Sequence, residues 1–150
     1  TIDADMRGRP MTAPTAGAVI SPTNSRAAIL GLLGGQGVRS VVMVEEELSD
    51  SAVLGTLRDL MRAGVRVYAV LPPSVPAPAR VTRCSSSAYP HAKVILTFGD
   101  RQPLGVFIGS QNLSRASLDD NREIGVIEPG LAVAAAGVMR SDIPSACWPT

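Results

Sequence analysis

The sequence predicts an α/β domain in which helices cover a mixed, mostly parallel sheet. Apolar segments of strand length alternate with segments whose apolar residues recur every three or four positions, and this alternation is typical of βαβ units. Residues 40–45 (SVVMVE) form a nearly continuous β-branched run, as expected for a strand covered on both faces. With 150 residues, the chain is long enough to bury one substantial core.

The first half of the chain predicts the order strand, helix, strand, helix, strand. Residues 16–20 (AGAVI) are a short strand candidate. Asn24 or Ser25 can then cap a helix that carries four apolar residues and ends at a glycine-rich stretch. The apolar residues of this helix are Ile29, Leu30, Leu32 and Leu33.

The second helix follows the strand at residues 40–45. Ser49 or Asp50 can cap this helix, and its apolar residues fall on a single face. Gly64 provides the C-terminal stop, and residues 65–71 (VRVYAVL) are the next strand. The apolar face consists of Val53, Leu54, Leu57, Leu60 and Met61.

The second half begins with a long connection and continues with strands. Residues 72–90 are rich in proline and serine and can hold a short strand at residues 80–84. Two strands are expected at residues 93–98 and 104–109, and a polar turn joins them.

A strand candidate at residues 122–127 and a closing helix at residues 131–139 complete the predicted elements. We therefore expect one domain at residues 17–140. A linker or tail is expected at residues 1–16, and a C-terminal tail at residues 141–150.

Net charge, the length of the apolar runs and the cysteine content limit the classes of protein to which the chain can belong. The formal net charge is +1, which gives no broad electrostatic reason to expect a nucleic-acid-binding protein. No apolar run reaches the roughly 18 residues needed to cross a bilayer, and the start carries no signal-peptide pattern. The chain begins at Thr1, so processing or excision from a longer protein is one interpretation, and the compartment stays open. Cys84 and Cys147 can form one disulfide or remain thiols.

The stretch YPHAKVILTF carries the most informative pair of residues. His91 is the only histidine and Lys93 the only lysine, whereas the other 13 basic residues are arginines. Because side chains alternate along a strand, an imidazole and an ammonium group two positions apart point to the same face. Such a pair suits an anionic group, most naturally a phosphate, since lysine is a compact charge and histidine titrates or attacks near neutral pH.

A second polar segment lies at the end of the next strand. Gly109 lets the backbone approach a ligand closely, and Ser110 and Asn112 add short hydrogen-bonding side chains. If the two strands are neighbours, these groups and the imidazole–ammonium pair converge on one site. Glu123 begins the following strand, where its carboxylate could hold the imidazole in one tautomer. Each residue alone also fits an ordinary surface or turn position, so their order and spacing carry the interpretation.

The chain resembles the phospholipase D superfamily in the order of three segments, HAK, GSQN and NREIGV. The family's signature is the HKD motif, HxK(x)4D, followed by GSxN and a later acidic residue. The chain also resembles one half of bacterial phospholipase D and cardiolipin synthase-like proteins in its upstream segments, SPTNSRAAILGLL, SVVMVEEELSD and LRDLMRAGVRVYAVLPP. The resemblance covers about residues 17–128 and implies an α/β/α sandwich.

The resemblance implies a role for five residues. His91 would be the nucleophile that forms a phosphohistidine, or the general acid that protonates the leaving group. Lys93 and Asn112 would bind the phosphate oxygens and stabilise charge in the transition state. Ser110 would lend a hydrogen bond near the phosphate, and Glu123 would orient the histidine. The implied chemistry needs neither a metal ion nor another cofactor.

Two features depart from the family's pattern. The motif places an aspartate at position 98, where this chain has Phe98, and Asp100 lies two residues later, which indicates a divergent subfamily. The family's mechanism also needs two histidines across a pseudo-twofold axis, and this chain has one. Either two copies pair as a homodimer, as in short single-motif bacterial nucleases, or the chain is the C-terminal half of a two-motif enzyme. The segment SPTNSRAAI favours the second interpretation.

The resemblance implies a phosphodiester hydrolase or phosphatidyltransferase that acts on phospholipids through a phosphohistidine. A homodimeric endonuclease is the first alternative, although the near-zero net charge argues against extensive contact with a nucleic-acid backbone. A catalytically silent half is the second alternative, and Phe98 is its best support. The expected partners are a phospholipid or another phosphodiester, a second HKD-bearing half or copy, and a membrane surface. Nucleic acid is less expected.

Overall fold

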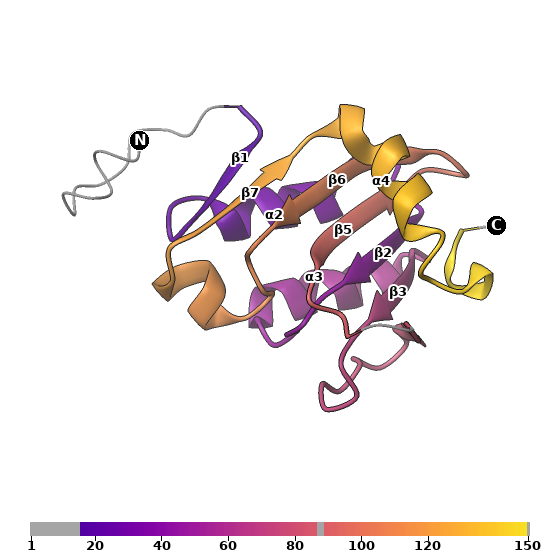
Figure 1. Ribbon diagram of the computed structural model, residues 1–150, viewed down its shortest axis with the longest axis horizontal. Coiled ribbons are helices and arrows are strands. Elements are labelled where there is room, and N and C mark those ends of the chain that lie inside the picture. Colours follow the sequence, from indigo (N-terminus) through magenta and orange to yellow (C-terminus); the bar gives the residue numbers. More distant parts are fainter. Residues whose placement is uncertain (1–15, 87–88, 150) are drawn as a thin grey trace.

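The computed structural model describes residues 16–86 and 89–149, and Figure 1 shows its ribbon. The described part contains seven strands, three α-helices and three shorter helical segments. In chain order these are β1 (Ala18–Ser21), α2 (Ser25–Leu33), β2 (Ser40–Val44), α3 (Ser51–Arg62), β3 (Arg66–Val70), β4 (Thr82–Cys84), β5 (Lys93–Phe98), β6 (Pro103–Gly109), η1 (Ala116–Asp120), β7 (Glu123–Ile127), η2 (Pro129–Leu131), α4 (Ala132–Met139) and η3 (Ser145–Cys147).

The seven strands of the described part form one sheet in the order β1-β7-β6-β5-β2-β3-β4. The pairs β2–β3 and β3–β4 are parallel, and the other neighbours are antiparallel. The prediction of a mostly parallel sheet is therefore wrong. Parallel neighbours need a crossover connection, which α3 supplies between β2 and β3, whereas β5 and β6 form a hairpin and β7 returns beside β6.

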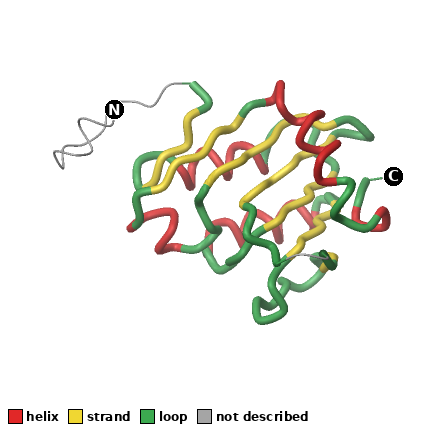
Figure 2. The backbone as a smooth tube through the Cα atoms, in the orientation of Figure 1, coloured by secondary structure: helices red, strands yellow, loops and turns green. Residues whose placement is uncertain are grey.

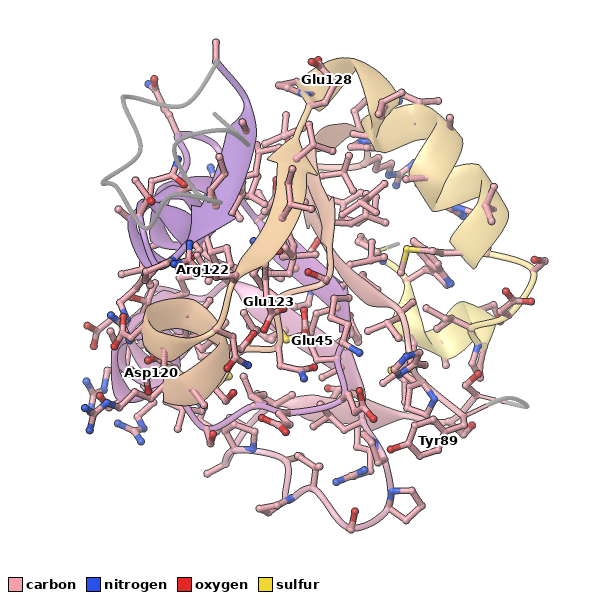
Figure 3. The ribbon with its side chains drawn as sticks, turned by 60° about the vertical axis from the view of Figure 1, so that its left-hand side comes forward. Glu45, Tyr89, Asp120, Arg122, Glu123 and Glu128 are labelled. Atoms are coloured by element: carbon pink, nitrogen blue, oxygen red, sulfur yellow. A yellow bond between two sulfur atoms is a disulfide. The ribbon has the colours of Figure 1, made fainter. Side chains whose placement is uncertain are left out.

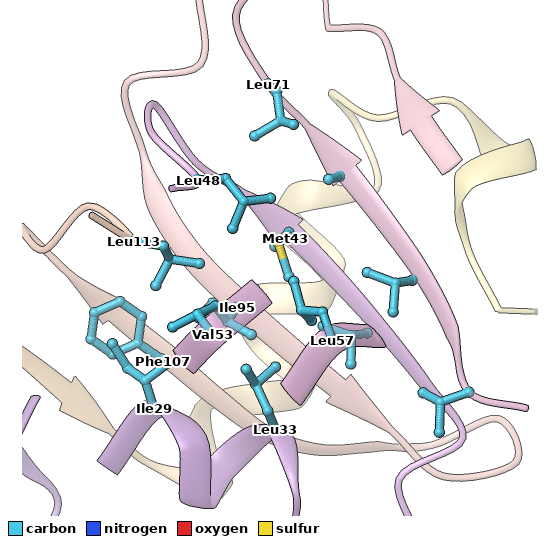
Figure 4. Close-up of a cluster of buried hydrophobic side chains, with 14 of the residues drawn as sticks. Ile29, Leu33, Met43, Leu48, Val53, Leu57, Leu71, Ile95, Phe107 and Leu113 are labelled. Carbon is cyan, nitrogen blue, oxygen red and sulfur yellow. The ribbon is translucent and has the colours of Figure 1, made fainter. Parts of the chain in front are cut away.

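Helices cover both faces of the sheet, which confirms the α/β/α sandwich. Helices α2 and α3 lie on one face, and α4 lies on the other (Figures 1 and 2). The larger cluster of buried side chains lies under α2 and α3, and Figure 4 shows part of it. The cluster includes Ile29 and Leu33 from α2, Val53 and Leu57 from α3, and Met43 and Ile95 from the sheet. These helix positions belong to the apolar faces that the periodicity predicts.

The second layer combines α4 with the C-terminal residues 141–149. Trp148 is buried there and packs edge-to-face on Phe98, with the ring centroids 6.0 Å apart. A disulfide joins Cys84 on β4 to Cys147, and the two Cα atoms are 6.1 Å apart. The sequence left the state of these cysteines open, and the structure shows the bridge.

The C-terminal residues 141–149 therefore differ from the expected tail, because Trp148 and the disulfide fix them to the sheet. The linker or tail expected at residues 1–16 lies outside the described residues, except for Ala16. Within residues 16–86 and 89–149, none of the helices is long and apolar enough to span a membrane.

Candidate functional site

The strand register brings the two polar segments to the same end of the sheet. Lys93, the first residue of β5, pairs with Gly109, the last residue of β6. On the other side of β5, Val94 pairs with Val44, the last residue of β2. Glu45, which follows β2, therefore lies next to Lys93. The strands β5 and β6 are thus neighbours, which is the arrangement that convergence of the two segments requires.

His91 and Lys93 meet a third residue, Glu46, which sequence reasoning did not single out. Lys93 Nζ lies 2.7 Å from Glu46 Oε2, and His91 Nδ1 lies 3.1 Å from the same oxygen. Lys93 Nζ also donates to the backbone oxygen of His91 at 2.9 Å and lies 3.3 Å from its Nδ1. The lysine side chain is 7% exposed, whereas the histidine side chain is 79% exposed. The two groups lie side by side as expected, although only Lys93 belongs to β5 and His91 lies in the segment before that strand.

The surroundings of Glu46 stabilise its ionised form. The hydrogen bond from Lys93 is the main cause that lowers the pKa of Glu46, and the hydrogen bond from Tyr89 acts in the same direction against the opposing effect of desolvation. Tyr89 Oη donates to Glu46 Oε1 at 3.1 Å, and this contact raises the pKa of the phenol. A run of three glutamates directly after a buried strand is the sequence signal that could have identified this residue.

Glu45, the adjacent acid, has the opposite environment. Its side chain is fully buried, and neither carboxylate oxygen has a hydrogen-bond partner among the described residues. Burial raises the pKa of Glu45 well above its usual range, and the charge of Lys93 opposes this effect only in part. In Figure 3, Glu45 is seen between Glu123 and Tyr89. The two neighbouring glutamates therefore have opposite environments, because burial favours the neutral form of Glu45 and pairing with Lys93 favours the ionised form of Glu46.

Within the described part of the chain, Glu123 has a partner other than His91. Its Oε1 accepts a hydrogen bond from Ser117 Oγ at 2.6 Å. Ser117 Oγ in turn accepts from the backbone N–H of Asn112 at 2.7 Å. Glu123 thus supports the loop that carries Asn112, whereas the carboxylate beside the imidazole belongs to Glu46.

Ser110 and Asn112 lie at the same end of the sheet, directly after β6. Ser110 is exposed, and its Oγ accepts from the backbone N–H of Ile124 at 3.2 Å. Asn112 is half-buried, and its Oδ1 has no hydrogen-bond partner among the described residues. Buried polar atoms are normally paired, so this acceptor oxygen is one of the few exceptions among the described residues.

Gly109 was expected to let a ligand approach the backbone closely. In the structure, the protein's own side chains fill the space beside this glycine. A Cβ added at Gly109 would lie 2.7 Å from Phe107 Cζ and would also overlap Gln111 Oε1. A Cβ added at its partner Gly125 would lie 2.6 Å from Phe107 Cε2. Gln111 is fully buried and donates from Nε2 to the backbone oxygen of Val19 at 3.1 Å. The glycine pair is therefore explained by packing.

The departure from the motif at position 98 also has a structural explanation. Side chains alternate along β5, so Phe98 belongs to the α4 face and Lys93 to the opposite face. Phe98 is completely buried against Trp148. Asp100 is exposed, and one of its oxygens lies 3.9 Å from Nε of Arg39. Neither residue 98 nor residue 100 takes part in the candidate site.

A cavity of about 830 Å³ opens beside the candidate site. It lies against β3, β4 and the residues before β5, and its wall includes Leu71, Arg83 and Tyr89. Because Tyr89 also contacts Glu46, the cavity and the candidate site share this side chain. Among the described residues, no group of three or more His, Cys, Asp or Glu side chains is arranged to hold a metal ion.

The fold is shared with solved structures of phospholipase D family proteins. Nuc from Salmonella typhimurium, a phospholipase D family member, is similar with a TM-score of 0.67 and 20% identity, over 86% of this chain and 93% of Nuc. NucT from Helicobacter pylori is similar with a TM-score of 0.65 and 17% identity, over 84% of this chain and 96% of NucT. The resemblance to the phospholipase D superfamily seen in the sequence is thus confirmed at the level of the fold.

Polyphosphate kinase from Porphyromonas gingivalis shares the fold as well, with a TM-score of 0.72 and 17% identity. The match covers 92% of this chain, but this chain spans only 24% of the kinase. No protein-family model and no curated protein sequence matches the chain.

Proposed function

We propose that this chain supplies one half of a phosphodiesterase site of the phospholipase D type, with His91 as the nucleophile. The observation that supports this most is the buried ammonium group of Lys93 beside the exposed imidazole, at the sheet end that also carries Asn112. Lysine is rarely buried unless it is paired, and a buried ammonium beside a histidine suits the binding of an anionic substrate.

The first step transfers the phosphoryl group to the histidine. The Nε2 lone pair of His91 attacks the phosphorus atom, an N–P bond forms, and the bond from phosphorus to the leaving oxygen breaks. The leaving oxygen takes a proton from a general acid, which the histidine of the paired half supplies. In the second step, a water molecule or an alcohol attacks the phosphorus atom, its proton returns to that histidine, and the N–P bond breaks.

Lys93 and Asn112 bind the non-bridging oxygens in this proposal, and Ser110 adds a hydrogen bond. The ammonium group offsets the negative charge that grows on these oxygens in the transition state. An ammonium has three donors, and in the structure two of them are directed at Glu46 and at the backbone oxygen of His91. Phosphate binding therefore requires Lys93 to use its remaining donor or to shift part of this bonding to the substrate.

The substrate that we propose is a phospholipid. Two glutamates, Glu45 and Glu46, lie beside Lys93, and the net charge of the chain is only +1. This charge distribution is unfavourable for a nucleic-acid backbone, which is held mainly by many Lys and Arg contacts to phosphates. A lipid brings a single phosphodiester. The cavity of about 830 Å³, with Val70, Leu71 and Pro73 in its wall, offers room for a group attached to that phosphate.

A homodimeric nuclease is the second candidate function. The coverage of 93% of Nuc and 96% of NucT supports it, because the fold of this chain then spans nearly the whole of both solved chains. The third candidate, a silent half, loses its main support, since Phe98 faces α4 and not the candidate site.

The test measures turnover of phosphatidylcholine vesicles and of a single-stranded oligonucleotide by the wild type and by His91→Ala, with EDTA present throughout. With the site completed by a second copy or a second half, we expect vesicle turnover that resists EDTA and falls by about 10³-fold or more in His91→Ala, because the nucleophile is lost. Asp100→Asn, an exposed position in the turn before β6, should match the wild type and serves as the control.

Equal and measurable turnover by the wild type and His91→Ala would contradict the histidine mechanism. Turnover of the oligonucleotide without turnover of the vesicles would favour the second candidate function, a homodimeric nuclease. Loss of activity on chelation would indicate a metal-dependent enzyme.

A further inference from the structure

We propose that Glu46, and not Glu123, is the residue that orients the His91 ring, by accepting a hydrogen bond from Nδ1–H and leaving Nε2 as the nucleophilic nitrogen. The consequence for catalysis rests on the proposed function, whereas the tautomer of the ring is a property of the folded chain itself. Glu46 is in this sense a positioning residue, since it acts on the substrate through the imidazole.

The position of Nδ1 selects one tautomer. Nδ1 lies 3.1 Å from Glu46 Oε2 and 3.3 Å from Lys93 Nζ. An ionised carboxylate only accepts hydrogen bonds, and an ammonium only donates them, so the two neighbours favour opposite tautomers. The contact with the carboxylate is the shorter one, and Lys93 has better acceptors in Glu46 at 2.7 Å and the backbone oxygen of His91 at 2.9 Å. The proton therefore belongs on Nδ1.

The chain holds the Glu46 backbone in place from both sides. On one side, the backbone N–H of Glu45 donates to the backbone oxygen of Val70 on β3 at 3.1 Å. On the other side, the backbone N–H of Leu113 donates to the backbone oxygen of Glu47 at 3.1 Å. The second bond also ties this loop to the segment that carries Asn112. A carboxylate on such a fixed backbone can set the direction of an exposed ring.

The two neighbouring glutamates do not compete for the lysine. Glu45 is buried without hydrogen-bond partners among the described residues, and burial favours its neutral form. Glu46 is partly exposed and paired with Lys93, and this pairing favours its ionised form. Of the two acids, only Glu46 has side-chain contacts with Lys93 and His91, so the ammonium and the imidazole share this carboxylate.

Glu123 has a different task in the same site. Its hydrogen bond to Ser117 Oγ, which accepts from the backbone N–H of Asn112, fixes the loop after β6. The two carboxylates thus support different residues of the proposed phosphate site. Glu46 orients the imidazole of His91, and Glu123 fixes the loop that carries Asn112.

The single histidine makes the test direct, because the imidazole nitrogens of the folded chain give one set of ¹⁵N signals. At a pH where the ring is neutral, long-range ¹H–¹⁵N spectra distinguish the Nδ1–H from the Nε2–H tautomer. We expect Nδ1–H in the wild type and a shift to a mixture or to Nε2–H in Glu46→Leu. Glu46→Gln, which keeps an acceptor oxygen, should retain Nδ1–H. Glu123→Gln and Glu47→Gln should leave the tautomer unchanged.

An Nε2–H ring in the wild type, or an unchanged tautomer in Glu46→Leu, would overturn the proposal. A shift in Glu123→Gln with none in Glu46→Leu would return the role to Glu123. Circular dichroism melting of each variant checks that the fold is retained, and Glu46→Ala, which also removes the acceptor oxygen, takes the place of Glu46→Leu if that variant does not fold.

Activity gives a second and separate readout. In Glu46→Leu we expect kcat to fall by about 10²-fold with a smaller change in KM, because a misdirected nucleophile slows the chemical step. Glu46→Gln should recover part of this loss, and Glu47→Gln should match the wild type. If His91→Ala proves as active as the wild type, the proposed function fails while the tautomer result still stands. If the tautomer is not set by Glu46, the present inference fails while the histidine mechanism can stand.

Discussion

At the scale of single residues, position 98 shows why a family motif does not transfer letter by letter. The motif's aspartate would stand where Phe98 is completely buried under α4, in contact with Trp148. The phenyl ring contributes to the core of this layer, and an aspartate would need a partner that the apolar surroundings do not provide.

We therefore expect Phe98→Asp to destabilise the protein by roughly 4 kcal/mol and to bring no gain in activity, because a large side chain is lost and a carboxylate is buried. Phe98→Leu, the matched control, should cost about 1 kcal/mol. Urea unfolding of the three proteins measures both differences. A Phe98→Asp protein as stable as the wild type and more active would show that position 98 belongs to the site after all.

Also at the residue scale, the sequence predicted the His91–Lys93 pair but not its carboxylate partner. The pair is readable because residues two positions apart at the entry to a strand can lie side by side, although only Lys93 belongs to β5 and His91 lies in the segment before it. The contact with Glu46 depends on the register between β2 and β5, which are separated by two further strands along the chain. No local pattern fixes such a register, so the family resemblance pointed to Glu123 instead.

At the scale of elements, one arginine connects α2, α3 and η1. Nη2 of Arg26 on α2 lies 2.7 Å from Asp50 Oδ2 and 2.7 Å from Asp119 Oδ2. Asp50 is also the N-cap of α3, where its Oδ1 accepts from the backbone N–H of Val53 at 3.0 Å. Burial alone would raise the pKa of Asp50, but the hydrogen bonds from Arg26 and Val53 outweigh it and lower that pKa. The hydrogen bond from Arg26 likewise lowers the pKa of Asp119.

Arg26→Met should lower the free energy of unfolding by about 2 kcal/mol near neutral pH, because it leaves the buried Asp50 without its cation. A lowered folded-state pKa stabilises the protein above the unfolded carboxyl pKa, and the effect disappears as pH falls through the folded pKa. The difference between variant and wild type should therefore shrink in acid. Arg62→Met, which removes an exposed pair with Asp59, should change stability by less than about 0.5 kcal/mol and serves as the control. Urea titrations at a series of pH values test this, and a difference that grows in acid would contradict it.

Most elements were predictable from the sequence because each has its own local period. The run at residues 40–45 and the apolar face of α3 are such cases. Whether neighbouring strands run parallel or antiparallel was not predictable in the same way, since it depends on whether the connection between them is a hairpin or a crossover. The C-terminal residues 141–149 were also missed, because a short aperiodic segment gives no sign of the disulfide and of the buried Trp148 that hold it.

At the scale of the whole molecule, the sheet is not fully covered on the α4 side. Ile108 and Val126, paired across β6 and β7, are exposed on this face, and so is Ile124 beside them.

The disulfide closes a separation of 63 residues, which corresponds to about 4 kcal/mol of stabilisation by loop-closure entropy. The described residues have their own core, yet the chain contains one histidine for a mechanism that, by the family resemblance, needs two.

Activity should therefore depend on pairing. If two copies complete the site, turnover per chain should fall on dilution, in parallel with the loss of dimer by light scattering, because the second histidine leaves with the partner. If the chain is half of a two-motif enzyme, the isolated monomer should be inactive at every concentration and should gain activity when the other half is added. A monomer with the same turnover per chain at all concentrations would contradict both forms of the requirement. It would mean that His91 acts with a general acid from its own chain, for which the exposed Tyr89, hydrogen-bonded to Glu46, would be the first side chain to replace.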